Sequence, residues 1–194
     1  MLRPDIARPV IRNGEVGENE WSTAGDAEAL AAALAAASTA AAAVLVPLAL
    51  WREQRDDLLA RRAAGVRLGV LLAPDDEPAD LAADLAHLAL IAVDFPQFTD
   101  GRGYSTARLL RERHGYAGEL RAVGDVQRDQ LFYMVRCGFN SFVLRADKDP
   151  VKALSAYRDF SEAYQAAVDQ PVPLFRRRHE VLARLGVAGA GAAA

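Results

Sequence analysis

The sequence contains a single cysteine, Cys137, among its 194 residues, which excludes an internal disulfide, a two-cysteine redox pair and a four-thiolate iron–sulfur site. In the segment MVRCGFNSF the cysteine precedes Gly138 near the expected end of a helix, which favours a buried structural thiol. The sequence also lacks a GxxxxGK(S/T) phosphate loop, a GxSxG nucleophile elbow and a CxxC pair. No cofactor site is therefore evident, and the cofactor, if one is used, is unknown. Redox chemistry would therefore need a partner protein that carries the cofactor.

Two weaker signals also fall short of a known site. The segment GRGYST, which begins at Gly101, lacks the third glycine of a dinucleotide fingerprint and does not directly follow a strand. The three histidines, His87, His114 and His179, have no spacing typical of a metal site, so we predict no metal.

Neither a strong charge imbalance nor a long apolar run is present. The 23 basic and 26 acidic residues give a net charge of −3, which argues against nucleic-acid binding. The first 15 residues lack the apolar core of a secretory signal, and polar residues and Pro47 interrupt the alanine-rich run at 27–50. We therefore expect a cytoplasmic protein that does not bind membranes.

Apolar runs alternate with helical segments along most of the chain. Runs typical of buried strands occupy 42–48, 66–72, 88–95, 119–124 and 141–146, and helices are expected at 50–65, 78–88, 105–115, 126–138 and 150–168. This alternation predicts an α/β fold with a mostly parallel sheet of about five βα units. The sheet would be open and doubly wound or an incomplete barrel, and the short chain favours the open sheet because a closed barrel usually needs eight units.

The two ends of the chain have a different composition from this central part. Residues 1–24 are expected to form a short hairpin segment, with its turn at Asn13-Gly14, and residues 25–170 the α/β domain. Residues 171–194 are expected to form a basic helix, FRRRHEVLARL, followed by a disordered Ala/Gly tail. The face of the basic helix would be solvated or would dock on an acidic partner.

Charged and amide side chains follow the predicted strands at the point where each strand ends. They are Asp75 and Asp76 after the second strand; Asp94, Gln97, Thr99, Asp100 and Arg102 at the third; Asp125, Gln127 and Arg128 after the fourth; and Arg145, Asp147 and Lys148 after the fifth. Because the carboxyl ends of parallel strands meet at one edge of a sheet, we expect one polar site there.

The loop around Asp100 has features of an anion site. Gly101 and Gly103 would let the backbone approach a ligand or adopt a positive φ, and the helix start near Ser105 would offer free N–H groups. Arg102 would hold an oxyanion by two hydrogen bonds. Asp100 and Arg145 complete the predicted set of anion-binding residues. In the alternative interpretation, Arg102 only pairs with Asp94 or Asp125 to hold the loops, and Asp100 caps the helix.

Two carboxylates are candidate catalytic groups. Asp94 closes an apolar strand and must find a partner or face solvent. Asp125 would act as a base or bind a cation, or instead cap the following helix. No acid/base pair with a fixed spacing emerges.

Two aromatic groups have open roles. Tyr157, Phe160 and Tyr164 are spaced to form one stripe of the last helix, which would pack in the core or make a dimer contact in a homo-oligomer. Phe95 and Phe98, with Tyr104, flank the polar loop and would wall a pocket or receive a protein partner.

The block DFPQFTDGRGYSTARLLRERHGYAGELRAVGDVQRDQLFYMVRCGFNSFVL (94–144) resembles the signature of a bacterial domain-of-unknown-function family whose members are labelled as oxidoreductases involved in sulfite reduction. With RNGEVGENEW and VPLALWREQRDDL upstream, the resemblance spans about residues 9–165. The characteristic positions of the family, as they stand here, are Asp94, Phe95, Phe98, Asp100, Gly101, Arg102, Ser105, Gly124, Asp125, Gln130, Arg136, Gly138 and Phe139.

This resemblance implies a role in sulfur assimilation with sulfite reductase as partner, and it transfers no catalytic residue. The expected function is an accessory protein of assimilatory sulfite reduction with an anion-binding site at the polar edge. The alternatives are an independent enzyme acting on a phosphorylated or sulfur-containing metabolite, with Asp94 or Asp125 as acid/base, and a flavin or nicotinamide oxidoreductase.

Overall fold

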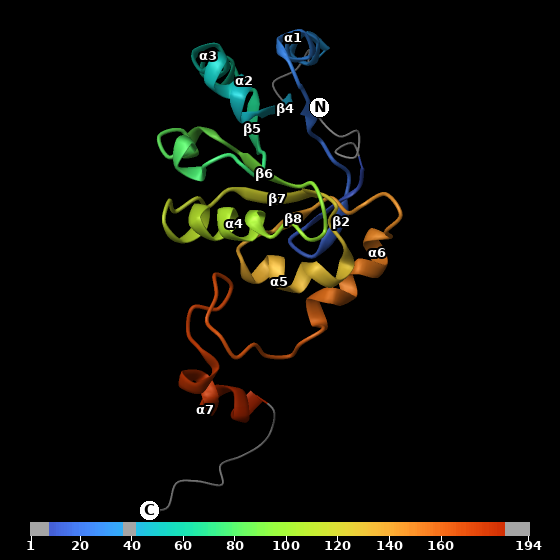
Figure 1. Cartoon of the computed structure of the whole chain (residues 1–194), viewed down its shortest axis with the longest axis vertical. Helices are drawn as coiled ribbons and strands as arrows, with labels where there is room; N and C mark the ends of the chain where they lie inside the picture. Colours follow the sequence, from blue (N-terminus) through green and yellow to red (C-terminus); the bar gives the residue numbers. More distant parts are fainter. Residues whose placement is uncertain (1–7, 37–41, 185–194) are drawn as a thin grey trace, which may run out of the picture.

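The computed structural model describes residues 8–36 and 42–184, which form one eight-stranded sheet with helices packed on it (Figure 1). The strand order is β2-β1-β8-β7-β6-β5-β4-β3. The strands are β1 (Val10–Arg12), β2 (Glu15–Gly17), β3 (Ser22–Thr23), β4 (Ala43–Pro47), β5 (Arg67–Leu72), β6 (Leu90–Phe95), β7 (Glu119–Gly124) and β8 (Ser141–Phe142). Strands β3 to β8 are parallel in sequence order, and β1 is antiparallel to both β2 and β8.

This order decides between the two predicted architectures. In a doubly wound sheet the strand order reverses once, whereas here successive parallel strands always lie side by side. The sheet is therefore an open, curled half-barrel, and the preference for the doubly wound form was wrong. The five predicted strands are confirmed, and β3 is an additional parallel strand. The N-terminal hairpin is confirmed and belongs to the same sheet through β1.

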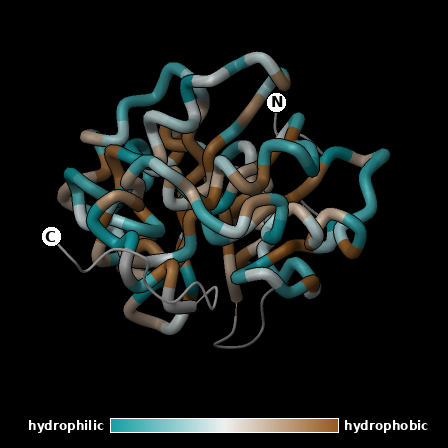
Figure 2. Tube along the Cα trace, turned by 90° about the horizontal axis from the view of Figure 1, so that it is seen from below, coloured by the Kyte–Doolittle hydropathy of each residue, from teal (hydrophilic) through white to brown (hydrophobic). Residues whose placement is uncertain are grey.

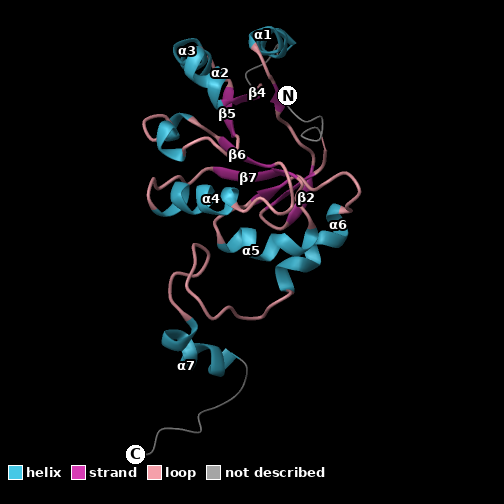
Figure 3. Cartoon of the chain, in the orientation of Figure 1, coloured by secondary structure: helices cyan, strands magenta, loops and turns pink. Residues whose placement is uncertain are grey.

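The helices mostly follow the predicted segments (Figure 3). They are α1 (Ala27–Ala36), α2 (Leu48–Glu53), α3 (Arg55–Ala63), η2 (Pro78–Leu81), η3 (Leu85–His87), α4 (Arg102–Glu112), η4 (Arg128–Gln130), α5 (Leu131–Arg136), α6 (Pro150–Ala153), η5 (Leu154–Arg158) and α7 (Leu174–Arg184). The predicted helix at 78–88 consists of two 3-10 turns. The basic helix is confirmed as α7, while the predicted disordered tail lies at residues outside those described.

The long helix predicted at 150–168 was wrong, because helical structure ends at Arg158. Phe160 and Tyr164 are 62% and 63% exposed, so beyond Arg158 there is little apolar burial to stabilise further turns. The predicted aromatic stripe therefore does not form, and only Tyr157 packs against the core.

Alternating strand residues build two apolar layers, one on each face of the sheet. In the Cα trace, hydrophobic stretches gather in the interior of the molecule (Figure 2). On one face Val70, Ile91 and Ala122 pack with helix residues such as Trp51 and Leu110. The other layer contains Val10, Trp21, Ala43, Leu45, Leu90, Ala92, Val123 and Val143. Gly69 faces this second layer, where a Cβ would lie 2.9 Å from the Trp21 ring. A glycine is required there because the indole occupies the space.

The predicted turn at Asn13-Gly14 is confirmed, and other helix ends show ordinary capping geometry. Asn13 and Gly14 adopt φ values of 51° and 83° in the hairpin turn, and the Asp26 carboxylate accepts a 2.8 Å hydrogen bond from the Ala29 N–H at the start of α1. Gly65, Gly115 and Gly138 all have positive φ where helices end.

The buried Tyr116 and the partly buried Tyr157 predict a loss of stability in alkali. Burial raises the pKa of Tyr116 and raises the pKa of Tyr157 to about 12. Above the ordinary tyrosine pKa of about 10, the unfolded chain loses these protons while the folded protein keeps them, so stability falls as the pH rises. We expect Tyr157 alone to cost on the order of 1 kcal/mol between pH 10 and 12. Urea unfolding across this range measures the loss, and Tyr157→Phe should flatten it; an unchanged slope would contradict the assignment.

Candidate functional site

The polar residues that follow strands β5 to β8 lie at the carboxyl edge of the sheet, as the parallel topology requires. We call nine charged residues of this edge the acidic rim: Asp75, Asp76, Asp94, Asp100, Arg102, Asp125, Arg145, Asp147 and Lys148. Arg128, which also follows β7, is not included because it pairs with Asp159 on the segment after η5. Ion pairs and hydrogen bonds connect the loops of successive strands across the rim. Most of the predicted site residues are thus brought to one edge, where they form two groups around two arginines.

The first group is centred on Arg102, the first residue of α4. Its guanidinium contacts both oxygens of Asp100, with Nε 3.0 Å from Oδ1 and Nη2 2.7 Å from Oδ2, and it also pairs with Asp75. The Arg102 backbone N–H donates to Asp100 Oδ1 at 3.2 Å. These hydrogen bonds from Arg102 lower the pKa of Asp100. The partners of Arg102 are therefore Asp100 and Asp75, in place of the pairing with Asp94 or Asp125 considered from the sequence.

The second group is centred on Arg145. Its Nε and Nη2 atoms lie 2.7 and 2.9 Å from the two oxygens of Asp147, and its Nη1 lies 3.1 Å from Asp125 Oδ1. Lys148 adds a 3.2 Å ion pair to Asp147. Hydrogen bonding to Arg145 lowers the pKa of Asp147 and raises that of Arg145.

Asp125 is a link between loops. Its Oδ2 accepts the Phe98 N–H at 3.1 Å, and its Oδ1 accepts the Gln127 side-chain amide at 3.3 Å. The prediction that Asp125 caps the next helix was wrong, because Gln127 caps η4 in a reciprocal capping box with Gln130. Asp94 is half-buried at the end of β6, with its Oδ1 2.6 Å from the position that a Cβ on Gly124 would take.

The two glycines of the loop have structural roles. Neither Gly101, with a φ of −89°, nor Gly103 is among the described residues with positive φ. A Cβ on Gly103 would lie 2.6 Å from the Phe95 ring, so this glycine allows α4 to approach β6 closely. Of the two alternatives considered for these glycines, a positive φ is therefore excluded. Ser105 lies one turn into α4, exposed in a shallow hollow beside Arg108 and Glu112.

The aromatic residues around the loop differ in exposure. Phe95 is fully buried, Tyr104 is half-buried and accepts a 3.2 Å hydrogen bond from Gln130, and Phe98 is 43% exposed. Only Phe98 therefore presents a large apolar surface beside the rim.

The chemistry of the rim follows from its charge. Six carboxylates face three cations, and each arginine already lies between two carboxylates. Because their pKa values are lowered, Asp100 and Asp147 stay ionised at neutral pH and are poor proton carriers. Within the described residues, no group of three or more His, Cys, Asp or Glu side chains is placed to hold a metal ion. The rim is suited to cationic partners, and an anion would have to displace a carboxylate from Arg102 or Arg145.

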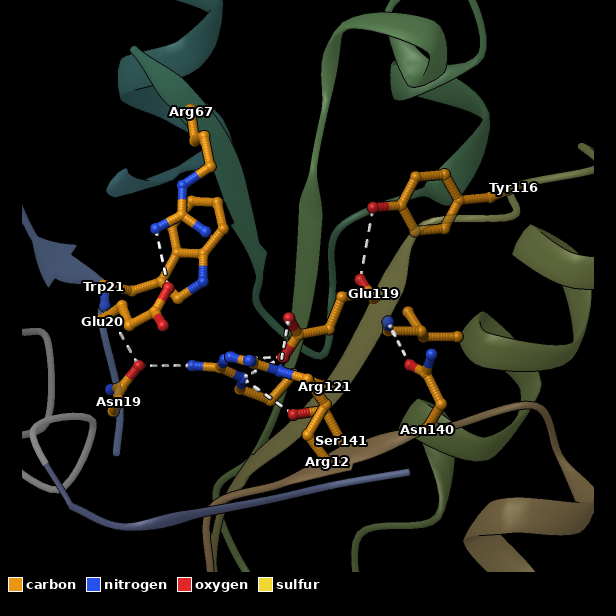
Figure 4. Close-up of polar contacts among 11 residues, drawn as sticks. Arg12, Asn19, Glu20, Trp21, Arg67, Tyr116, Glu119, Arg121, Asn140 and Ser141 are labelled. Carbon is orange, nitrogen blue, oxygen red and sulfur yellow. Dashed lines mark hydrogen bonds and ion pairs between the residues drawn. The ribbon is translucent and has the colours of Figure 1, made fainter. Parts of the chain in front are cut away.

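A second polar cluster, at the opposite edge of the sheet, was missed by sequence reasoning (Figure 4). Arg121 is fully buried, and its guanidinium donates to Glu119, Asn19 and Ser141 at distances from 2.6 to 3.1 Å. Glu119 also pairs with Arg12 at 3.1 Å. The signal was present in the sequence as an arginine inside the apolar strand ELRAVG. Because the cluster is closed by mutual contacts at the amino edge of the strands, its role is to join β1, β7, β8 and the 18–21 segment.

Comparison with known families gives one match. The model of a family described as bacterial protein of unknown function (DUF934) matches residues 69–175, which is more than half of the chain and includes the whole acidic rim. A search of curated proteins found no match. Among the residues that the structure describes, no helix combines the length and apolar character needed to cross a bilayer.

Proposed function

The chain belongs to the bacterial DUF934 family. We propose that it is an accessory protein of assimilatory sulfite reduction that docks on the reductase through its acidic rim. The charge of the rim is the observation that carries the proposal. The similarity of residues 94–144 to proteins labelled with sulfite reduction supports the choice of partner.

An accessory role fits the residues better than catalysis of sulfite reduction by this chain. A sulfite reductase catalytic subunit would need sirohaem and an iron–sulfur cluster, and the single Cys137 cannot ligate that cluster. The described rim carboxylates with lowered pKa values, Asp100 and Asp147, are suited to charge pairing and not to proton transfer.

The exposed groups of the rim have the chemistry of a docking surface. The side chains of Asp75 and Asp147 are 89% and 55% exposed, and Phe98 supplies an aromatic group beside them. Aromatic residues are enriched at protein interfaces, while surrounding charges steer the encounter and select the partner. A complementary surface on the reductase would be basic and would contain an apolar contact for Phe98.

Removing the exposed rim charges should weaken this docking. We expect the double variant Asp75→Asn/Asp147→Asn to bind the reductase about tenfold more weakly, mainly through slower association, and wild-type binding to weaken with salt. Surface plasmon resonance with the purified reductase at two salt concentrations measures both effects. The matched control is Asp56→Asn/Asp57→Asn on α3, which removes the same charge from exposed carboxylates far from the rim in the sequence. Absence of binding by the wild-type protein, or equal weakening in both variants, would refute docking through the rim.

One observation favours a second function, an enzyme acting on a small anionic metabolite. The two-oxygen contact between Arg102 and Asp100 has the geometry in which an arginine binds an oxyanion, and the Arg102 side chain is 52% exposed. In this candidate, Asp94 or Asp125 would be the acid/base and the substrate would displace Asp100.

This second function predicts a ligand-dependent stabilisation that requires Arg102. Sulfite, sulfate or phosphate should raise the melting temperature of the wild-type protein, and Arg102→Ala should abolish the rise, since the guanidinium supplies the contact. Arg52→Ala is the control, because Arg52 is similarly exposed and pairs with Asp80, and neither residue belongs to the rim as defined. If the anions do not stabilise the wild-type protein, or if they stabilise the wild-type protein and Arg102→Ala equally, Arg102 is a structural residue only.

A further inference from the structure

A cleft unrelated to the acidic rim lies between helices α4 and α5 and the irregular segment after η5. It encloses a cavity of about 560 Å³. Its floor is formed by Arg136, whose side chain is 9% exposed, and by Cys137, which is 7% exposed. Tyr133 and Tyr164 stand at the mouth and are more than half exposed. On the wall, the alanines at 163, 166 and 167 leave the space open because their side chains are too short to fill it.

The charge of this cleft is one-sided. Its lining contains two arginines, Arg108 and Arg136, and no carboxylate. A smaller adjoining cavity of about 240 Å³ shares Arg136, but its lining also contains Glu162 and Asp169. The larger cleft is therefore the more favourable of the two for an anion.

Each of the two arginines already has partners within the protein. Arg136 donates to the Gln165 backbone carbonyl and lies 3.5 Å from Asp169, contacts that engage two of its five N–H groups. Arg108 is fixed by a 2.8 Å ion pair with Glu112, one turn further along α4. The buried Arg136 guanidinium is thus preorganised, which lowers the entropic cost of binding a ligand, whereas the Arg108 side chain is 57% exposed.

We propose that this cleft binds a small organic oxyanion, meaning a carboxylate, sulfonate or phosphate attached to an apolar body. The oxyanion lies between Arg108 and Arg136, and the apolar body lies between the rings of Tyr133 and Tyr164. The volume falls within the range of small-molecule pockets, which is roughly 300–1,000 Å³. Burial raises the pKa of the Cys137 thiol, so this group is neutral at physiological pH and does not repel the anion. The site is independent of the rim and of the proposed docking.

The single cysteine gives a direct test of occupancy. Benzenesulfonate serves as the probe, and the rate of Cys137 alkylation by N-ethylmaleimide is measured in the full-length protein with and without it. We expect saturating benzenesulfonate to slow alkylation severalfold, because the ligand covers the thiol. Calorimetric titration with the same probe is the second measurement, which does not depend on the reactivity of the thiol.

Two variants separate anion binding from general surface effects. Arg108→Gln should weaken benzenesulfonate binding about tenfold, because it removes a charge-assisted contact. Arg113→Gln removes the same charge from an exposed position at the end of the same helix, outside the cleft, and should leave binding unchanged. Three results would each overturn the proposal: no calorimetric binding of benzenesulfonate, equal binding by the two variants, or equally strong binding of the neutral analogue benzenesulfonamide.

Discussion

Replacing Arg121 with alanine is expected to lower the free energy of unfolding by about 3–5 kcal/mol. The side chain is fully buried, and its loss would leave the carboxylate of Glu119, whose side chain is only 15% exposed, with Arg12 as its remaining described ion-pair partner. It would also leave the buried Ser141 hydroxyl without the guanidinium that it contacts, while the Asn19 side-chain oxygen would keep the Trp21 N–H as a donor. Uncompensated buried polar groups are among the few causes of such large losses. Urea unfolding followed by circular dichroism measures the change.

Arg67→Ala is the matched control for this prediction. Arg67 is also an arginine of the sheet with a single carboxylate partner, Glu20 at 2.8 Å, but its side chain is 43% exposed. Solvent screening makes such a pair worth about 1 kcal/mol or less. The double variant Glu119→Gln/Arg121→Met, which removes both charges and keeps most of the volume, should recover much of the stability lost in Arg121→Ala. Similar losses for Arg67→Ala and Arg121→Ala would show that burial does not determine the effect.

Local sequence patterns were sufficient for most of the strands and turns. The run LIAVDF gives β6 because strands covered on both faces need continuous apolar residues, and Asn13-Gly14 gives the hairpin because both residues tolerate positive φ. The two-residue β3 was missed because Ser22–Thr23 carries no periodic signal. The choice between a doubly wound sheet and a half-barrel depends on which strands become neighbours, and this is a tertiary property.

Helix propensity failed where packing was missing. The segment after Arg158 has helix-forming residues, yet its aromatic side chains Phe160 and Tyr164 are more than 60% exposed, and the chain runs as an irregular segment to α7 (Figure 1). The backbone of this segment is tied to α5 through Arg136, which accepts the Val168 N–H at its carbonyl and contacts the Gln165 carbonyl with its side chain. Such contacts have no periodic pattern in the sequence.

The position of the acidic rim was predictable, whereas its pairings were not. Parallel strands place the residues that follow them at one edge, and this topological rule needs only the order of the elements. Which carboxylate meets which arginine depends on loop geometry at the scale of a hydrogen bond, as the pairing of Arg102 with Asp75 and Asp100 shows. Because each of the two central arginines is paired with two carboxylates, the edge predicted to bind an anion is a mostly acidic surface. That change favours a basic protein partner over a free anion.

Both the fold and the geometry of the acidic rim depend on Gly124. Gly124→Ala is expected to lower the free energy of unfolding by about 2–4 kcal/mol. Gly124 has a φ of 97°, and a Cβ would lie 2.4 Å from the Phe95 carbonyl oxygen and 2.6 Å from Asp94 Oδ1. The neighbouring Asp125 N–H donates to the same carbonyl at 2.7 Å, so relief of the clash would displace the connection between β6 and β7.

Gly115→Ala separates backbone strain from this clash. Gly115 also has a positive φ, of 66°, but nothing lies within 4 Å of the position that a Cβ would take there, so strain alone should cost about 1–2 kcal/mol. The difference between the two losses in urea unfolding measures the close approach at Gly124. Since Asp125 also holds the Phe98 N–H, Gly124→Ala should weaken docking on the reductase more than Gly115→Ala does, under conditions where both variants are folded. Equal losses of unfolding free energy in Gly124→Ala and Gly115→Ala would mean that the connection between β6 and β7 can shift at little cost. The rim would then lack the fixed geometry that a docking surface requires.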